Sequence, residues 1–227
     1  MLRDIITCLI DINKYGCHGD LKLENIVYDE PTKTGFIIDF GLAAPFDMTI
    51  SSLYNLNMGR RQISVDVIIG YLHQNIKKDV RKLESLYLEH LDLIQKTIDN
   101  FGLFWVILES ISNINIDTYI GSSHISQSRT PKIFSDYLNF YFNLDQNETS
   151  LTLELRKLFN YKSLPELRQE FIDDVYDEMT EEQYELYFDN NDELFTTFMS
   201  KIIGLIAVDP TMRIPREVLL EDQFFHK

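Results

Sequence analysis

Apolar residues recur with a helical period along most of the chain. From Leu2 to Asn13 they fall on one face, and Tyr15-Gly16 is expected to end that helix. A second amphipathic helix is predicted from Asp79 to Ile98. The residues that follow, 99–109, are apolar on nearly every face, which is typical of a buried central helix. Capping-box patterns at 163–166 and 180–183 should open two more helices, and further helices are predicted over 131–142, 193–208 and 215–225.

Two short apolar runs differ from this helical pattern. Residues 26–28 and 36–38 read as strands, and the turn-rich segment 29–35 lies between them. The two strands should pair as a small hairpin that holds Asn25 and Asp39 at its two ends. From residue 42 to about 75 no strong periodicity is visible, so no regular element is predicted there. The expected fold is mainly α-helical with one small hairpin.

The charge of the chain is unusual and regional. The 227 residues carry a net charge of −15, and residues 145–193 hold fifteen acidic side chains against four basic ones. A solvated acidic face on helices explains such a run, and a docking surface for a basic protein substrate or partner is the alternative. Nucleic acid is not an expected partner, because phosphate backbones bind positive charge.

Other features of the composition indicate a soluble intracellular protein. Cys8 and Cys17 are the two cysteines, and without a secretory signal they suggest reduced thiols in the cytosol or nucleus. The longest apolar run, 103–108, is far too short to cross a bilayer, so no membrane association is expected. Richness in Ile, Asn, Lys and Tyr is associated with AT-rich genomes, such as those of large DNA viruses or protists.

One pair of motifs carries recognisable chemistry. His18-Gly19-Asp20-Leu21-Lys22-Leu23-Glu24-Asn25 is followed by Asp39-Phe40-Gly41. An Asp and an Asn five residues apart can place a proton acceptor beside a metal ligand, and a second Asp after a strand can close the other side of the cation. Such an arrangement suits phosphoryl transfer, in which the protein mainly positions the reactants and neutralises charge. The order resembles the eukaryotic-type protein kinase signature, H-R-D-L-x-x-x-N and then D-F-G.

The resemblance implies a role for each motif residue. Asp20 would be the catalytic base, and Lys22 would neutralise charge on the phosphoryl group transferred from ATP. A Lys at this position is associated with Ser/Thr protein substrates. Asn25 and Asp39 would supply oxygen ligands to Mg²⁺. His18 would brace the loop without reacting.

Two distant segments extend the resemblance to nearly the whole chain, 1–227, as a kinase C-terminal lobe. Asp99, in Asp-Asn-Phe-Gly-Leu, resembles the central-helix residue that accepts hydrogen bonds from the catalytic-loop backbone, although an ordinary helix N-cap is the alternative. Asp209-Pro210-Thr211-Met212-Arg213 resembles the D-P-x-x-R that closes the lobe, where a helix-joining turn is the alternative. The resemblance implies a buried ion pair for Arg213.

The activation region departs from the family pattern. Gly19 stands where most kinases have the Arg that pairs with a phosphorylated activation segment, so phosphate on Thr49, Ser51 or Ser52 would have no partner in this loop. The same H-G-D occurs in kinase-like small-molecule phosphotransferases, which provide an alternative function.

No A-P-E motif lies between Gly41 and Asp99, so Glu84 or Glu89 is the expected partner of Arg213. The sequence has no G-x-G-x-x-G, and the chain begins within the helix that would feed the catalytic loop. A truncated kinase that needs a separate N-lobe is therefore expected, and a non-catalytic binding module is a further alternative.

Overall fold

A computed structural model of the chain describes residues 1–46, 64–68, 89–114, 131–158, 161–162 and 164–226. The prediction of a mainly helical fold with a small hairpin is confirmed in this part of the chain. The helices are α1 (Leu2–Ile12), α5 (Leu91–Thr97), α6 (Asn100–Ile111), α8 (Pro131–Leu144), α9 (Ser150–Leu158), α10 (Pro165–Asp177), α11 (Glu181–Phe188), α12 (Asp192–Gly204) and α13 (Arg216–Leu220). Short 3₁₀ turns are η1 (Leu23–Asn25), η2 (Phe40–Leu42), η4 (Pro210–Met212) and η5 (Gln223–His226).

The strands form two antiparallel pairs. The predicted hairpin consists of β2 (Ile26–Asp29) and β3 (Thr34–Ile37), in the register Ile26↔Ile37. A second pair, β1 (Gly16–Cys17) with β4 (Ala44–Pro45), was not predicted from the sequence. A Cβ atom on Gly16 would lie 2.2 Å from the Ala44 carbonyl oxygen, so this pairing requires glycine. The pairing of β1 with β4 holds the segment after the hairpin against the chain that leaves α1.

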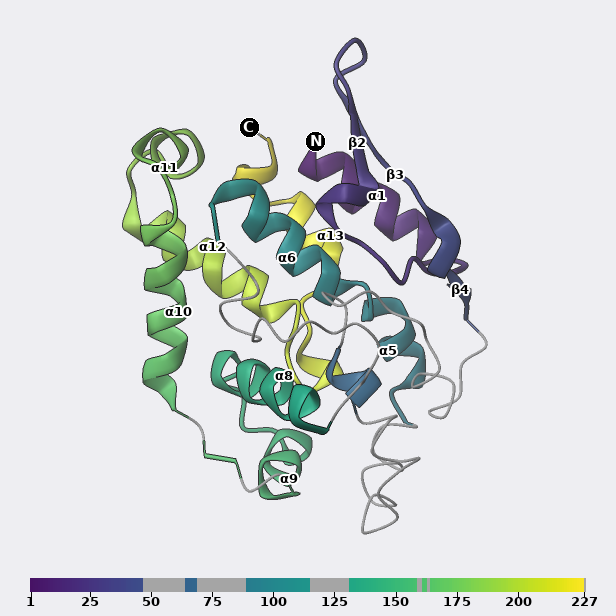
Figure 1. The fold of residues 1–227 in the computed structure, drawn as a ribbon, viewed down its shortest axis with the longest axis vertical. Helices are drawn as coiled ribbons and strands as arrows, with labels where there is room; N and C mark the ends of the chain where they lie inside the picture. Colours follow the sequence, from purple (N-terminus) through teal and green to yellow (C-terminus); the bar gives the residue numbers. More distant parts are fainter. Residues whose placement is uncertain (47–63, 69–88, 115–130, 159–160, 163, 227) are drawn as a thin grey trace.

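Helix α6 runs through the middle of the molecule, as predicted for the apolar segment (Figure 1). Phe104 and Trp105 have no exposed surface. The rings of Phe104 and Trp105 meet edge to face at 5.0 Å, and Trp105 stacks on Phe140 of α8 at 5.5 Å. No helix in the described ranges is both long and apolar enough to span a bilayer.

Several helix boundaries in the structure differ from those predicted from the sequence. The capping box at Thr180 is present, since its hydroxyl accepts from the Gln183 N–H at 3.1 Å and the Gln183 side chain accepts from the Thr180 N–H at 2.8 Å. The other predicted box depends on Ser163, which lies outside the described residues, and α10 begins after Leu164 without a side-chain cap. The closing helix is shorter than predicted, because the Asp222 carboxylate accepts the Phe224 N–H and starts a separate turn.

Two other differences concern whole helices. Helix α9 was not predicted, although its sequence is amphipathic with a helical period. Of the helix predicted from Asp79 to Ile98, the described part is α5, and residues 79–88 lie outside the described ranges.

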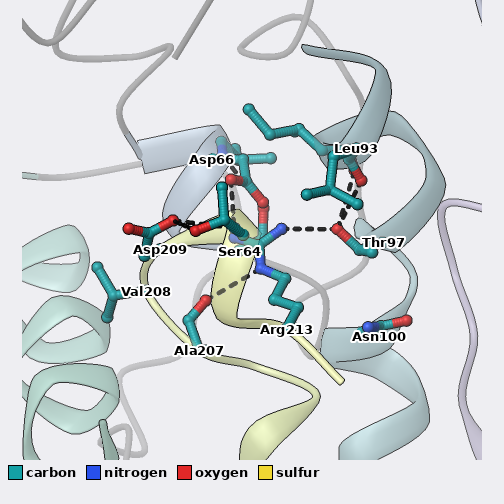
Figure 2. Close-up of polar contacts among 12 residues, drawn as sticks. Ser64, Asp66, Leu93, Thr97, Asn100, Ala207, Val208, Asp209 and Arg213 are labelled. Atoms are coloured by element: carbon teal, nitrogen blue, oxygen red, sulfur yellow. Dashed lines mark hydrogen bonds and ion pairs between the residues drawn. The ribbon is translucent and has the colours of Figure 1, made fainter. Parts of the chain in front are cut away.

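Arg213 lies at the junction of three chain segments (Figure 2). Its guanidinium bonds to Asp66 Oδ1 at 2.9 Å, and both side chains have no exposed surface. Nη1 donates to Thr97 Oγ1 at 2.9 Å and Nε donates to the Ala207 carbonyl at 3.0 Å. The group also lies over the Phe101 ring, with its central carbon 5.0 Å from the ring centroid. The predicted buried ion pair of Arg213 is confirmed.

The predicted partner of Arg213 was wrong. Asp66, in the helical residues 65–68, occupies the position that the sequence argument gave to Glu84 or Glu89. Glu89 is exposed, and Glu84 lies outside the described residues. A buried guanidinium needs a carboxylate that is buried with it, and Asp66 lies in a buried stretch with Val65 and Val67.

Replacement of Arg213 by Ala should lower the free energy of unfolding by roughly 3–5 kcal/mol, because it leaves the Asp66 carboxylate buried and unpaired. Urea unfolding would measure the change. Lys201→Ala is the matched control, since it breaks the partly exposed pair with Asp222 and should cost about 1 kcal/mol or less. The double variant Asp66→Val/Arg213→Met should recover part of the loss. An Arg213→Ala protein as stable as wild type would contradict the role given to this pair.

Candidate functional site

One buried carboxylate, that of Asp99, anchors the backbone of the loop from His18 to Asn25. Asp99 Oδ2 accepts from the His18 N–H at 2.8 Å, and Oδ1 accepts from the Gly19 N–H at 3.0 Å. Oδ2 also accepts from Asn13 Nδ2 at 3.0 Å. Asp99 is fully buried, and its side chain makes no capping bond to α6. The expected contact with the loop backbone is confirmed, and the N-cap alternative does not describe this side chain.

His18 braces the same loop against the end of the hairpin. Its ring is buried, and Nδ1 accepts from the Asp20 N–H at 3.2 Å. Because a backbone N–H can only donate, Nδ1 carries no proton and Nε2 must donate to the Ile38 carbonyl, 3.1 Å away. The ring also meets Phe40 edge to face at 5.0 Å. The His18 imidazole therefore links the loop from His18 to Asn25 to the segment that carries Asp39.

Asp20, Lys22 and Asn25 are brought together by hydrogen bonds. Asp20 Oδ2 accepts from Lys22 Nζ at 2.6 Å and from Asn25 Nδ2 at 3.1 Å. Asn25 Nδ2 also donates to the Asp20 carbonyl at 2.8 Å. Because the amide nitrogen of Asn25 faces Asp20, its oxygen is the atom left to bind a cation. The Asp20 side chain is 13% exposed and that of Lys22 is 33% exposed, so both are partly accessible to solvent.

Asp39 stands beside this group and is not bonded to it in the described structure. The Ile38 N–H donates to the Asn25 carbonyl at 2.9 Å, which places the residue before Asp39 directly opposite Asn25. The Asp39 carboxylate is exposed and accepts from the Gly41 N–H at 3.1 Å. Its backbone is left-handed, with φ 62° and ψ 76°. Such a conformation is costly for a residue other than glycine, and it is found more often at functional sites than elsewhere.

A magnesium ion at this position would take few ligands from the protein. The described residues contain no group of three or more His, Cys, Asp or Glu that could hold a metal. The predicted pair is one amide oxygen, from Asn25, and one carboxylate, from Asp39. Both are hard oxygen donors of the kind that Mg²⁺ binds, and Mg²⁺ commonly takes its remaining ligands from phosphate and water. The residue types therefore fit the ion as part of a nucleotide complex.

Gly19, where the kinase pattern has Arg, is fitted tightly into this loop. Its φ is +79°, and an added Cβ would lie 2.5 Å from the Leu42 carbonyl oxygen. Any other residue would be strained in backbone conformation and would also push against η2. Gly19 is thus part of the packing between the loop from His18 to Asn25 and the segment after Asp39.

Two buried polar residues, one beside the site and one in the Arg213 ion pair, were not assigned a role from the sequence. Asn13 donates to Asp99 and, at 2.8 Å, to the Gly16 carbonyl. The sequence did carry a signal for Asn13, because it is a polar residue on the apolar face of its helix. Asp66 had no such signal, since nothing distinguishes it from an exposed acid in an aperiodic segment.

Neither a scan against protein-family models nor a search of curated proteins finds a match for this chain. The chemistry of the site is therefore argued from its own residues and their contacts.

Substitution of Asp99 by Asn should weaken the hydrogen bonds that anchor the backbone of the loop from His18 to Asn25. An amide keeps one acceptor oxygen and turns an N–H toward donors, so at least one loop amide loses its bond. We expect the free energy of unfolding to fall by about 2–3 kcal/mol. Hydrogen exchange at His18 and Gly19 should accelerate more than exchange in α12. Asp11→Asn, which removes an exposed acid from α1, is the control, and equal exchange in the two variants would contradict the role of Asp99.

The two cysteines should differ in reactivity. Burial, and to a lesser extent the nearby Asp99, raises the pKa of the Cys17 thiol to about 12, so its thiolate fraction is negligible near neutral pH. Burial and two acids also raise the pKa of Cys8, which is less buried. At about pH 8 a thiol reagent should label Cys8 slowly and Cys17 only after unfolding. The number of labelled thiols should be counted in the Cys8→Ser variant, which keeps only Cys17, and in the Cys17→Ser variant, which keeps only Cys8. Complete labelling of Cys17 in the folded Cys8→Ser variant would refute the prediction.

Proposed function

We propose that this chain is the C-terminal lobe of a Ser/Thr-type protein kinase, which transfers the γ-phosphoryl group of ATP to a protein hydroxyl. The observation that carries the proposal is the cluster of Asp20, Lys22 and Asn25, held by hydrogen bonds on a loop whose backbone is anchored to Asp99. Asp39 lies on the adjacent segment. An acid, a cation and two oxygen ligands at one place are the parts that phosphoryl transfer requires.

Each residue has a role that follows from its contacts. Asp20 orients the substrate hydroxyl and accepts its proton. Lys22 already lies on the Asp20 carboxylate and stabilises charge on the phosphoryl group as it moves. Asn25 and Asp39 would hold Mg²⁺, which neutralises the nucleotide phosphates when bound. His18 positions Asp20 through the Asp20 N–H and takes no part in proton transfer.

An exposed apolar face beside the site supports the need for a covering domain. Val27 and Phe36 are cross-strand neighbours in the hairpin, and Ile38 lies two residues beyond Phe36 on the same side. These three side chains and Phe40 are 45%, 47%, 42% and 52% exposed. An apolar patch of this kind next to a polar site marks a surface that another component covers. We propose that an N-lobe covers it and supplies the loop and Lys that hold ATP phosphates.

The acidic helices support a basic protein as substrate or partner. Acidic side chains of α10, α11 and the start of α12 line a hollow of about 570 Å³. They include Asp177, Glu181, Glu185 and Asp192. Opposite charge on a partner would speed encounter with this surface. A basic segment is therefore the proposed docking element on the substrate.

A phosphate-transfer assay tests the proposed function. The bare chain should bind Mg·ATP poorly, and a fusion to a compatible N-lobe should phosphorylate Ser or Thr in a basic protein. Asp39→Asn and Asp20→Asn should each lower the rate of the fusion by at least about 100-fold, because metal binding and base catalysis are lost. Asp29→Asn is the matched control, since this hairpin acid bonds only to its own turn residue Thr32 in the described structure and should leave the rate unchanged.

The alternatives correspond to different results of the same assay. Strong Asp39-dependent activity of the bare chain would show that no N-lobe is needed. Phosphate transfer to amino alcohols or aminoglycosides, with none to protein, would support a small-molecule phosphotransferase. A folded fusion that transfers no phosphate but still binds the basic protein would favour a non-catalytic binding module.

A further inference from the structure

A second cavity lies apart from the cluster of Asp20, Lys22 and Asn25. It has a volume of about 510 Å³ and is lined by residues of α1, α5, α6 and α13. This volume lies within the range of small-molecule binding sites. None of the four residues proposed for phosphoryl transfer lines it. The cavity is therefore large enough for a ligand of its own.

The accessible walls of the cavity are mostly apolar. Ile10 of α1, Leu93 of α5 and Phe46, the residue after β4, are half-buried and line it. Their remaining surface lies within a cavity and not on an open face of the protein. Apolar surface of this kind is stabilised when an apolar ligand removes it from water.

The polar residues in the walls are already engaged within the protein. Thr97 Oγ1 accepts from Arg213 Nη1 at 2.9 Å, and Asn100 Oδ1 accepts from Arg216 Nε. Two atoms without a partner, Asn13 Oδ1 and Arg216 Nη2, are buried below the accessible surface, so a ligand in the cavity cannot contact them. These side chains therefore offer a ligand few hydrogen bonds.

Two of the cations that line the cavity have a carboxylate partner. Arg213 pairs with Asp66 at 2.9 Å, and Lys14 pairs with Asp11 at 2.6 Å. The first pair is fully buried and the second is exposed. Neither cation is left without a counter-ion.

Arg216 and Lys96 differ in this respect. Burial lowers the pKa of Arg216 to about 10, and the carboxylates of Asp99 and Glu217 oppose that shift, so both act on the guanidinium. Lys96 lies in the last turn of α5, is exposed at the edge of the cavity, and forms no ion pair in the part of the chain that the structure describes. Asp92, one turn earlier on α5, is not bonded to it. Lys96 is thus the lining cation whose charge is available to a ligand.

We propose that this cavity binds a small hydrophobic carboxylate. The apolar body of the ligand lies against Ile10, Phe46 and Leu93, and its carboxylate lies at the edge beside Lys96. An exposed ion pair contributes little free energy, so apolar burial supplies most of the affinity and Lys96 selects the sign of the ligand's charge. The site does not depend on the proposed kinase function, because the two share no ligand-binding residue.

Calorimetry with four simple probes tests both parts of the proposal. Octanoate has the apolar body and the negative charge, 1-octanol has only the body, octylamine has the body with a positive charge, and acetate has only the negative charge. Octanoate should bind saturably with one site per chain. We expect 1-octanol to bind about two- to fivefold more weakly, the range for one exposed charge pair, octylamine more weakly still, and acetate not at all.

Two results would contradict the proposal. Octylamine or 1-octanol binding as tightly as octanoate would overturn the role of Lys96. The absence of saturable octanoate binding would overturn the site.

Variants locate the binding. Lys96→Glu, an exposed change that should not disturb folding, should reverse the preference so that octylamine binds more tightly than octanoate. Lys33→Glu makes the same charge change at an exposed lysine of the hairpin turn and should leave the preference as in wild type. An unchanged preference for octanoate in Lys96→Glu, or a reversed one in Lys33→Glu, would overturn the assignment.

A second pair of variants tests the apolar wall. Leu93→Gln should weaken octanoate and 1-octanol binding together, by at least about fivefold, because a polar group replaces apolar contact surface. Leu91→Gln is the matched control, since Leu91 is also half-buried on α5 but packs against the core and does not line the cavity. Circular dichroism should show that both variants keep the wild-type fold. Equal affinity for octanoate in the two folded variants would contradict the proposed position of the ligand.

Discussion

The buried carboxylate of Asp99 is the constraint on which the loop from His18 to Asn25 depends. A charged group without exposed surface must find donors inside the protein, and Asp99 finds them in His18, Gly19 and Asn13. Because two of these donors are backbone amides, the carboxylate determines the path of the chain and not merely the position of a side chain. The orientation of Asp20 follows from that path. A residue eighty positions away along the chain thereby determines the geometry of the loop.

The motif residues differ in how far the folded chain prepares them. Lys22 and Asn25 both donate to the Asp20 carboxylate, so these three side chains have already lost most of their conformational freedom. Asp39 is different, because its carboxylate bonds to its own turn and its backbone is in a left-handed conformation. The folded chain thus fixes Lys22 and Asn25 against Asp20 and leaves the Asp39 carboxylate apart from them.

Features with local causes were predictable from the sequence, and features with distant causes were not. Helical periodicity gave α1, and a segment apolar on nearly every face gave α6. The capping pattern gave the start of α11, and two short apolar runs on either side of a turn-rich segment gave the hairpin. The burial of Arg213 was expected from a short motif, but its partner Asp66 was not. The pairing of β1 with β4 was also missed, since two-residue strands have no periodicity and depend on Gly16 meeting a carbonyl far along the chain. The close approach of Gly19, with its positive φ, to Leu42 was likewise not predicted.

The contact between Asp66 and Arg213 has a consequence for synthesis of the chain. The two residues are separated by 147 positions. During translation Asp66 emerges long before its counter-ion exists, so the segment around it cannot become buried without leaving a charge unpaired. Residues 64–68 can therefore join the core only after Arg213 has been synthesised. Until then their apolar side chains remain available to chaperones.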